Sequence, residues 1–197
     1  SSEAWVLSAV HGKHWVAQRV PDDEVMVIPN YYTITEVDLQ DTANFTGSAD
    51  LITYAKARNW YDPGKDGAFN FRRAYGAPRT LANFGNIARK WKGIELITGR
   101  EFPMDEPFPF AVKPAQKLAL EDFMRVLENH YEGSSLDDTR GYRFGNPHAH
   151  GPNSICSRIN QFSIVAELRE DMPVDIGAVM WLAPRRPCMQ PFIPWYA

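Results

Sequence analysis

The first thirty residues consist of short apolar runs separated by turn residues. Trp5, Leu7 and Ala9 alternate along the first run, and residues 14–20 resume an extended pattern after Gly12. Runs of β-branched and aromatic residues on either side of a glycine turn predict a β-hairpin. Because both faces of these runs are largely apolar, we expect the hairpin to lie in a layered core, covered on both sides and away from any solvated edge.

A third short strand is predicted at residues 25–28. Pro29 suits the end of this strand, because proline has no N–H to donate to a sheet. Asn30 comes next, at a point where a polar side chain can leave the sheet and face a cleft. Its amide can donate two hydrogen bonds, so the residues alone favour a ligand-binding role and a turn-capping role about equally.

Helical spacing begins farther along the chain. A helix is predicted at residues 49–58 with Ser48 as its N-cap, and a second at residues 79–91. Residues 115–131 have the strongest helical pattern, with apolar side chains along one face. The stretch before it, residues 102–114, carries four prolines and is expected to be extended and irregular.

The remainder of the chain turns from polar to β-rich. Residues 134–153 are polar, glycine-rich and without periodicity, which is typical of a functional loop or a lid. Residues 155–168 and 176–182 are apolar and β-rich, and they predict a second hairpin. Two hairpin regions separated by helical and irregular segments indicate the α+β class, and the length of the chain fits a single domain over residues 1–197.

Composition and charge exclude several classes of protein. The net charge is −3 and the pI is about 5.9, with basic and acidic residues interspersed, so we expect no binding to nucleic acid. No apolar run reaches the roughly 20 residues that a membrane helix needs. We expect a protein without a membrane span and without a cofactor. A cytoplasmic location is expected, with secretion left open.

The two cysteines and the nearby histidines are candidates for chemistry. Cys156 with His148 and His150 has the composition of a cysteine nucleophile and its base, and the two histidines have the composition of half a metal site. We favour simpler interpretations: Cys156 opens an apolar strand as a small buried hydrophobe, and no further ligands are recognised beside the histidines. We therefore expect no metal, and we expect Cys156 and Cys188 to be free thiols.

Arg19 interrupts an otherwise apolar strand. A guanidinium in that setting needs a carboxylate partner, which can come from the protein or from a substrate. Asp22 and Asp23 follow closely and supply the structural alternative. The sequence favours neither, so Arg19 is a candidate substrate-binding residue.

Several short motifs, in this order, resemble the dipeptidase A-like peptidases, a family of N-terminal-nucleophile (Ntn) hydrolases. They extend over nearly the whole chain, and such an ordered series is far more specific than one short pattern. The motifs are Glu3-Ala-Trp-Val, Trp15-Val-Ala-Gln-Arg-Val-Pro-Asp-Asp23, Ile28-Pro-Asn30, Glu36-Val-Asp-Leu39, Asn44-Phe45, Ser48-Ala-Asp-Leu51, Phe69-Asn-Phe71, Tyr75-Gly76, His130-Tyr-Glu-Gly133, Val179-Met-Trp181 and Pro191-Phe-Ile-Pro194.

The resemblance implies both a fold and an activity. The fold it implies is the four-layer αββα sandwich, and the activity is hydrolysis of the amide bond of dipeptides by a cysteine uncovered at the mature N-terminus. In related Ntn hydrolases an Asn at the end of a short strand donates a hydrogen bond to the tetrahedral oxyanion, and the resemblance gives this role to Asn30. Fixed donors of this kind contribute about 2.7–4 kcal/mol to transition-state stabilisation.

No cysteine in this chain matches the position of the family's nucleophile. We therefore expect a segment of a longer dipeptidase, inactive without its N-terminal half, whose partners are a dipeptide substrate, the remainder of the same chain and further copies of itself in a homo-oligomer. Two alternatives are a non-catalytic interaction or lid module and an Ntn amidase that uses Ser1 as its nucleophile.

Overall fold

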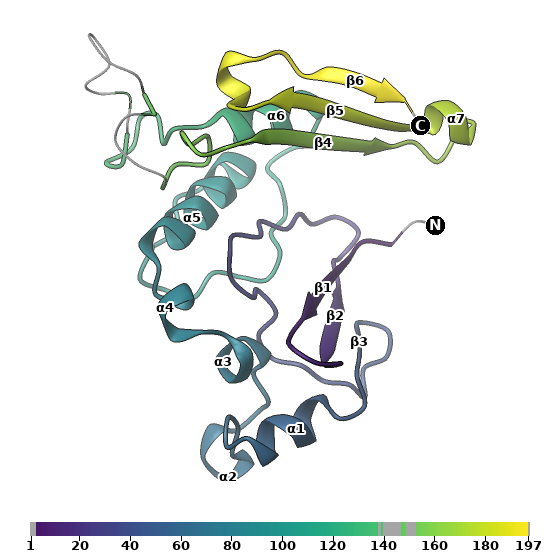
Figure 1. Cartoon of the computed structure of the whole chain (residues 1–197), viewed down its shortest axis with the longest axis vertical. Coiled ribbons are helices and arrows are strands. Elements are labelled where there is room, and N and C mark those ends of the chain that lie inside the picture. Colours follow the sequence, from purple (N-terminus) through teal and green to yellow (C-terminus); the bar gives the residue numbers. More distant parts are fainter. Residues whose placement is uncertain (1–2, 138, 140–146, 149–152, 197) are drawn as a thin grey trace. The chain divides into compact units, whose positions relative to one another are not determined.

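The computed structural model of the chain describes residues 3–137, 139, 147–148 and 153–196 (Figure 1). The chain divides into two compact units. The first unit comprises Ser1–Lys90 and Phe102–Pro114, and the second comprises Trp91–Glu101 and Ala115–Ala197. Both units combine helices with antiparallel strands, so the α+β class is confirmed. None of the helices in the described ranges is both long and apolar enough to cross a membrane.

The first unit contains one sheet and several short helices. The helix α5 (Phe84–Thr98) begins in this unit and ends in the second. The other elements of the first unit are β1 (Trp5–Ala9), β2 (Trp15–Arg19), β3 (Phe45–Gly47), α1 (Leu51–Ala57), α2 (Pro63–Asp66), α3 (Phe71–Tyr75) and α4 (Pro78–Leu81).

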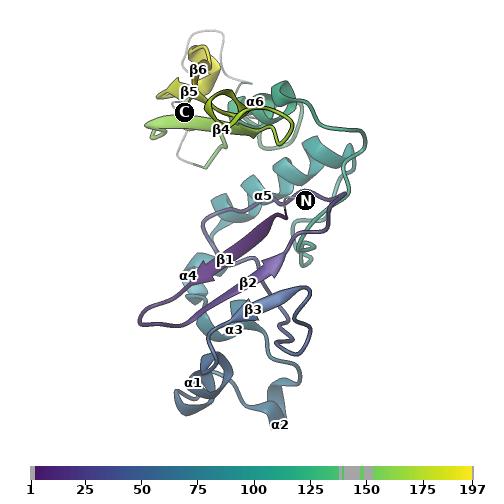
Figure 2. The ribbon, with the colours of Figure 1, turned by 90° about the vertical axis from the view of Figure 1, so that its right-hand side faces the viewer.

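The predicted N-terminal hairpin is confirmed. Strands β1 and β2 pair antiparallel with Ala9 opposite Trp15, and β3 pairs with the other edge of β2 (Figure 2). Gly12 lies in the turn with a φ of 89°, which glycine adopts without strain. The expected cover on both sides is wrong for β1, because Leu7 is 64% exposed whereas Val6 on the opposite face is buried. The reason is that β1 is an edge strand of a sheet with one covered face.

The prediction of a strand at residues 25–28 is wrong. Val25 alone forms an isolated bridge, with its N–H donating to the carbonyl of Val112 at 2.8 Å and its carbonyl accepting at 3.0 Å. Its partner belongs to the proline-rich stretch 102–114, which is irregular as predicted and cannot continue a ladder. The third strand of the sheet is β3 instead.

The predicted helices of this unit exist with shifted ends. Helix α1 begins after Asp50, because the Ser48 side chain accepts a hydrogen bond from the Trp15 N–H at 3.1 Å and does not cap the helix. The helix predicted at residues 79–91 is two helices, α4 and α5. The break lies at Asn83, whose side-chain oxygen accepts from the Asn86 N–H at 3.1 Å and so starts α5.

The core of the first unit joins the sheet to α1, α3 and the segment that follows Asn30. Phe71, at the start of α3, is fully buried and lies against the rings of Tyr32 and Tyr75. This packing fixes the chain on both sides of a pocket that Tyr32 and Tyr75 help to line. The buried members of the core are Val6, Val16, Val20, Ile34, Val37, Leu51, Ala55, Phe69 and Phe71.

The second unit contains a three-stranded antiparallel sheet in the order β4-β5-β6. The predicted second hairpin is confirmed as β4 and β5, while β6, which contains Pro194, was not predicted. Proline is tolerated there since β6 is an edge strand. The elements of this unit, besides the end of α5, are α6 (Leu120–Glu128), β4 (Phe162–Leu168), α7 (Val174–Gly177), β5 (Ala178–Pro184), η2 (Pro187–Met189) and β6 (Ile193–Tyr196).

Helix α6 is shorter than the predicted helix at residues 115–131. It begins at Leu120, where the Asp122 carboxylate accepts a hydrogen bond from the Ala119 N–H at 2.8 Å. It ends because Asn129 is extended and Tyr131 has a positive φ of 68°. The helix is therefore confirmed at its centre and wrong at both ends. Most of the loop predicted at residues 134–153 lies outside the described residues.

One face of the second sheet is apolar and exposed. Alternate residues of β4 point outward, and Leu168 is 81% exposed. Met180 and Trp195 are register partners on β5 and β6 and are exposed as well. An apolar face of this extent commonly marks an interface.

A pH prediction follows from Lys90, which lies in α5 and is only 2% exposed. Burial, and then the charge of Arg72, lowers the pKa of Lys90 to about 8. Between this pKa and the ordinary lysine value the unfolded chain binds a proton that the folded chain does not, so stability rises with pH. We predict that the free energy of unfolding rises by about 2 kcal/mol more in the wild type than in Lys90→Met between pH 8 and pH 10.

Urea unfolding at each pH, followed by circular dichroism, measures this difference. Lys56→Met is the matched control, because Lys56 is an exposed helical lysine whose removal leaves the pH slope intact. An equal slope in the wild type and Lys90→Met would contradict the prediction.

Candidate functional site

A pocket of about 510 Å³ opens beside β1 in the first unit, and Asn30 lies on its wall. Its volume is within the range of small-molecule sites, and its lining is mainly apolar with a few polar groups, as such sites usually are. The lining residues are Val6, Leu7, Ser8, Ala9, Ile28, Pro29, Asn30, Tyr31, Tyr32, Thr33, Tyr75, Gly76, Ala77, Thr80 and Leu81.

Hydrogen bonds hold the main chain of Asn30 in place, whereas its side chain is exposed to solvent. The Tyr31 N–H donates to the Pro29 carbonyl at 2.9 Å, which makes a tight turn around Asn30. The buried Asn86 side chain donates to the carbonyls of Asn30 at 3.3 Å and Thr80 at 3.1 Å. The Asn30 side chain is exposed and makes no hydrogen bond within the described part of the chain. The structure therefore places Asn30 at a cleft, and its oxyanion role stays a prediction.

Two residues of the pocket wall carry buried hydroxyls. The Tyr31 Oη and Thr33 Oγ1 atoms have no hydrogen-bond partner among the described residues, although the two residues are only 8% and 3% exposed. Burial raises the pKa of Tyr31, and Arg72, 4.4 Å from its ring centroid, partly offsets this. Buried hydroxyls are normally satisfied, so these two groups keep unused hydrogen-bonding capacity beside the pocket. No pattern in the sequence points to either residue.

Arg19 does not line this pocket. Its Nε donates to Glu3 Oε1 at 3.2 Å and its guanidinium donates to Asp22 Oδ1 at 2.5 Å. Asp23, the other predicted partner, pairs with Lys113 instead, at 2.6 Å. These contacts favour the structural alternative for Arg19, and its substrate role stays a prediction.

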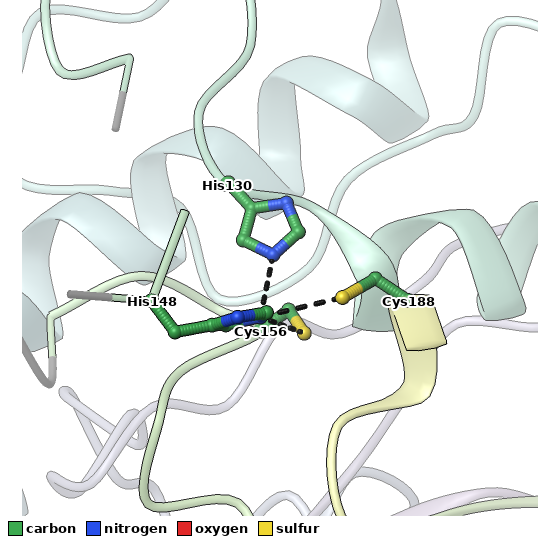
Figure 3. A group of neighbouring side chains, drawn as sticks. All are labelled: His130, His148, Cys156 and Cys188. Carbon is green, nitrogen blue, oxygen red and sulfur yellow. Dashed lines mark hydrogen bonds between the residues drawn. The ribbon is translucent and has the colours of Figure 1, made fainter. Parts of the chain in front are cut away.

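A second group of polar side chains lies within the second unit (Figure 3). Four side chains from separate segments meet there: His130 after α6, His148, Cys156, and Cys188 in η2. Their ligand atoms all lie within 4.8 Å of one another. His148 Nε2 is 3.0 Å from His130 Nε2, 3.4 Å from Cys156 Sγ and 3.3 Å from Cys188 Sγ. We call these four residues the His–Cys cluster.

The hydrogen bonds of the His–Cys cluster distribute its protons unequally. Burial alone raises the pKa of Cys156, but hydrogen bonds with His130 and Cys188 bring that pKa below the ordinary cysteine value. Burial and the bond to Cys156 raise the pKa of Cys188 to about 12. Burial, and then the charge of His130, lowers the pKa of His148. Cys156 is therefore the thiol that most readily becomes a thiolate, and His148 is held neutral.

His130 has an additional partner outside the cluster. Burial alone lowers the pKa of His130, but its bonds with Cys156 and Glu132 outweigh burial and raise it. Glu132 contacts His130 twice at 2.8 Å, through the ring Nδ1 and the main-chain N–H. This carboxylate fixes the orientation of the ring, so that Nε2 faces the cluster.

The cluster corrects the interpretation of its residues from sequence. Cys156 is fully buried, as predicted, but it lies in a loop, because β4 begins only at Phe162. The expectation that no further ligands lie beside His148 is wrong, since the fold brings His130 and both cysteines to it. Both cysteines are free thiols, as predicted. His150 and Ser1 lie outside the described residues.

Comparisons with known proteins identify a family. The sequence model of peptidase family C69 matches residues 1–197. The chain is 29% identical to a probable dipeptidase of Salmonella dublin, covering 100% of this chain and 45% of the relative. It is 26% identical to dipeptidase A of Lactobacillus helveticus (98% and 40%) and 28% identical to a dipeptidase of Bifidobacterium longum (93% and 37%). The chain thus spans less than half the length of these relatives.

The unpaired hydroxyl of Thr33 leads to a stability prediction. Thr33→Val removes a buried hydroxyl without a partner while keeping the shape of the side chain, so we expect the free energy of unfolding to rise by about 1 kcal/mol. Thr98→Val is the matched control, because the buried Thr98 hydroxyl donates to the Ile94 carbonyl at 2.8 Å and its loss destabilises. Urea unfolding compares the two variants. Equal destabilisation by both would show that the Thr33 hydroxyl is already satisfied.

Proposed function

This chain belongs to peptidase family C69, and from that premise we propose that it is a segment of a cysteine-dependent dipeptidase that hydrolyses the amide bond of dipeptides. Three relatives carry the name dipeptidase and match nearly the whole of this chain. The observation that carries the proposal is the pocket beside β1, in which an available Asn30 amide stands on a fixed main chain.

The pocket supplies binding and electrostatic stabilisation. A thiolate attacks the carbonyl carbon of the dipeptide amide, and the carbonyl oxygen takes up the negative charge of the tetrahedral intermediate. The Asn30 side-chain N–H donates to this oxygen, and Asn86 keeps the Asn30 main chain in place. The intermediate then collapses with cleavage of the C–N bond, the leaving amine takes a proton, and water hydrolyses the thioester.

The polar groups beside Asn30 fit a small polar substrate. The Tyr31 and Thr33 hydroxyls are each able to donate one hydrogen bond and accept others, without breaking a bond within the described protein. Such groups suit the charged ends or the peptide carbonyl of a dipeptide. The apolar remainder of the lining suits its side chains.

The nucleophile of the proposed reaction lies outside these 197 residues. Cys156 is fully buried and bonded within the His–Cys cluster, so a substrate cannot reach it. Cys188 is more accessible, but its Sγ belongs to the same cluster and lies 3.3 Å from His148 Nε2. The segment by itself is accordingly proposed to be inactive.

The remainder of the dipeptidase also has a place to pack. The exposed apolar face of β4, β5 and β6 supports a further layer on this sheet, as in the αββα sandwich of Ntn hydrolases. The remainder of the same protein is the proposed partner for this face. Assembly into a homo-oligomer is the alternative for covering it.

The test is Asn30→Ala in the full-length enzyme. Loss of one oxyanion donor is expected to lower kcat by about 10²–10³-fold on a dipeptide substrate, with little change in the thermal unfolding midpoint. Asn30→Asp keeps the size of the side chain but removes its donors, so it is expected to lose as much. Steady-state kinetics with purified dipeptides gives both numbers.

Gln40→Ala is the control, since Gln40 is an exposed amide in the same unit that does not line the pocket. An unchanged kcat in Asn30→Ala refutes the oxyanion role. If the full-length protein cleaves no dipeptide at all, the proposal of a dipeptidase fails as a whole. Undiminished activity of the isolated segment, abolished by Ser1→Ala, would favour the amidase alternative.

A further inference from the structure

The contacts of His148 are more numerous than one nitrogen atom can satisfy. His148 Nε2 lies within hydrogen-bonding distance of His130 Nε2, Cys156 Sγ and Cys188 Sγ (Figure 3). A neutral imidazole nitrogen carries either one proton or one lone pair, so it can form one of these hydrogen bonds. Three partners converging on one atom are explained by a cation at their centre, to which each contributes a lone pair.

We propose that His130, His148, Cys156 and Cys188 bind a structural Zn²⁺ ion. Two imidazole nitrogens and two thiolates are a ligand set typical of zinc. All four positions of a tetrahedral ion are taken by protein, so no position is left for water or substrate. The ion therefore has a structural role and takes no part in the dipeptidase reaction.

The distances fit such an ion. With Zn–N bonds of about 2.0–2.1 Å and Zn–S bonds of about 2.3 Å, a tetrahedron separates two nitrogens by about 3.3 Å and a nitrogen from a sulfur by about 3.5 Å. The corresponding separations here are 3.0 Å between the two histidines and 3.4 and 3.3 Å from His148 to the cysteines. The remaining separations are at most 4.8 Å, against no more than about 3.8 Å in such a tetrahedron, so shifts of up to about 1 Å would place all four atoms on the ion.

The surroundings of the ligands also fit. The Glu132 carboxylate accepts from His130 Nδ1, which leaves a lone pair on Nε2, and a carboxylate behind a ligating histidine is a common feature of zinc sites. Cys156, His148 and His130 are at most 5% exposed, and burying so many polar atoms is costly unless they are paired.

The proposed ion joins segments that are distant from one another in the sequence. In the described residues the large cluster of buried apolar side chains belongs to the first unit, and the second unit contributes none of its members. The ion ties the end of α6 to the loop before β4 and to η2 after β5. A cross-link of this kind stabilises a unit whose own apolar core is small.

The first experiment measures zinc in the full-length protein. The wild type, purified without chelator, is expected to contain one more zinc ion per chain than the double variant Cys156→Ser/Cys188→Ser, by inductively coupled plasma mass spectrometry. His14→Gln is the matched control: His14 is a buried histidine of the first unit, paired with Asp50 at 3.1 Å, and its loss leaves the zinc content unchanged. Co²⁺ loaded in place of zinc is expected to show thiolate-to-cobalt charge-transfer absorption in the wild type only.

Two further measurements test the proposal even if the double variant fails to fold. X-ray absorption at the zinc edge of the wild type is expected to give two sulfur and two nitrogen neighbours. Glu132→Gln keeps all four ligands and is expected to weaken zinc binding by about 10–100-fold in a competition with a chelator. Zinc content equal to that of the double variant, or an absorption spectrum without sulfur neighbours, overturns the proposal. An intact mass showing a disulfide between Cys156 and Cys188 in the wild type overturns it as well.

Discussion

A buried polar atom can form only as many hydrogen bonds as its protons and lone pairs allow, and this limit determines how both sites of the chain are understood. At the pocket beside β1, the Tyr31 and Thr33 hydroxyls have fewer partners than they can accommodate. In the His–Cys cluster, His148 Nε2 has more partners than it can satisfy. A deficit of protein partners points to a bound molecule that supplies them, whereas an excess points to a shared ion. The same limit on hydrogen bonds therefore indicates a different kind of ligand in each unit.

The sequence predicts those parts of the fold that depend on local pattern. The hairpin of β1 and β2 and that of β4 and β5 follow from alternating residues close together in the chain, and both are confirmed. The failures involve partners that are distant in sequence. Residues 25–28 have strand-forming side chains but face a proline-rich partner, and β6 has prolines but an ordered partner in β5. Strand formation at these places depends on the neighbouring chain more than on intrinsic preference.

The same division applies to the sites. Asn30 is predicted from sequence because the resemblance implies a role for it, and the structure places it on the wall of a pocket while its role stays a prediction. His130 and Cys188 are not found, since the cluster assembles from four segments without the short ligand spacings by which zinc sites are usually recognised. Helix α6 matters here: it ends before His130, and the positive φ of Tyr131 turns the chain at the histidine. A helix continued through residue 131, as the periodicity suggests, would have hidden the ligand in a regular element.

The second unit exposes several large apolar side chains of its sheet, while a group of polar side chains is buried within it. Its sheet exposes Leu168 and Trp195, while His148 and Cys156 are buried. An exposed apolar face does not stabilise the unit until another layer covers it, so the folded unit needs a source of stability that acts within it. The proposed ion, joining the end of α6 to the loop before β4 and to η2, would provide such a source. The same ion would leave the apolar face of the sheet free for the proposed remainder of the protein, so the two proposals, a structural metal and a substrate pocket, are consistent with each other.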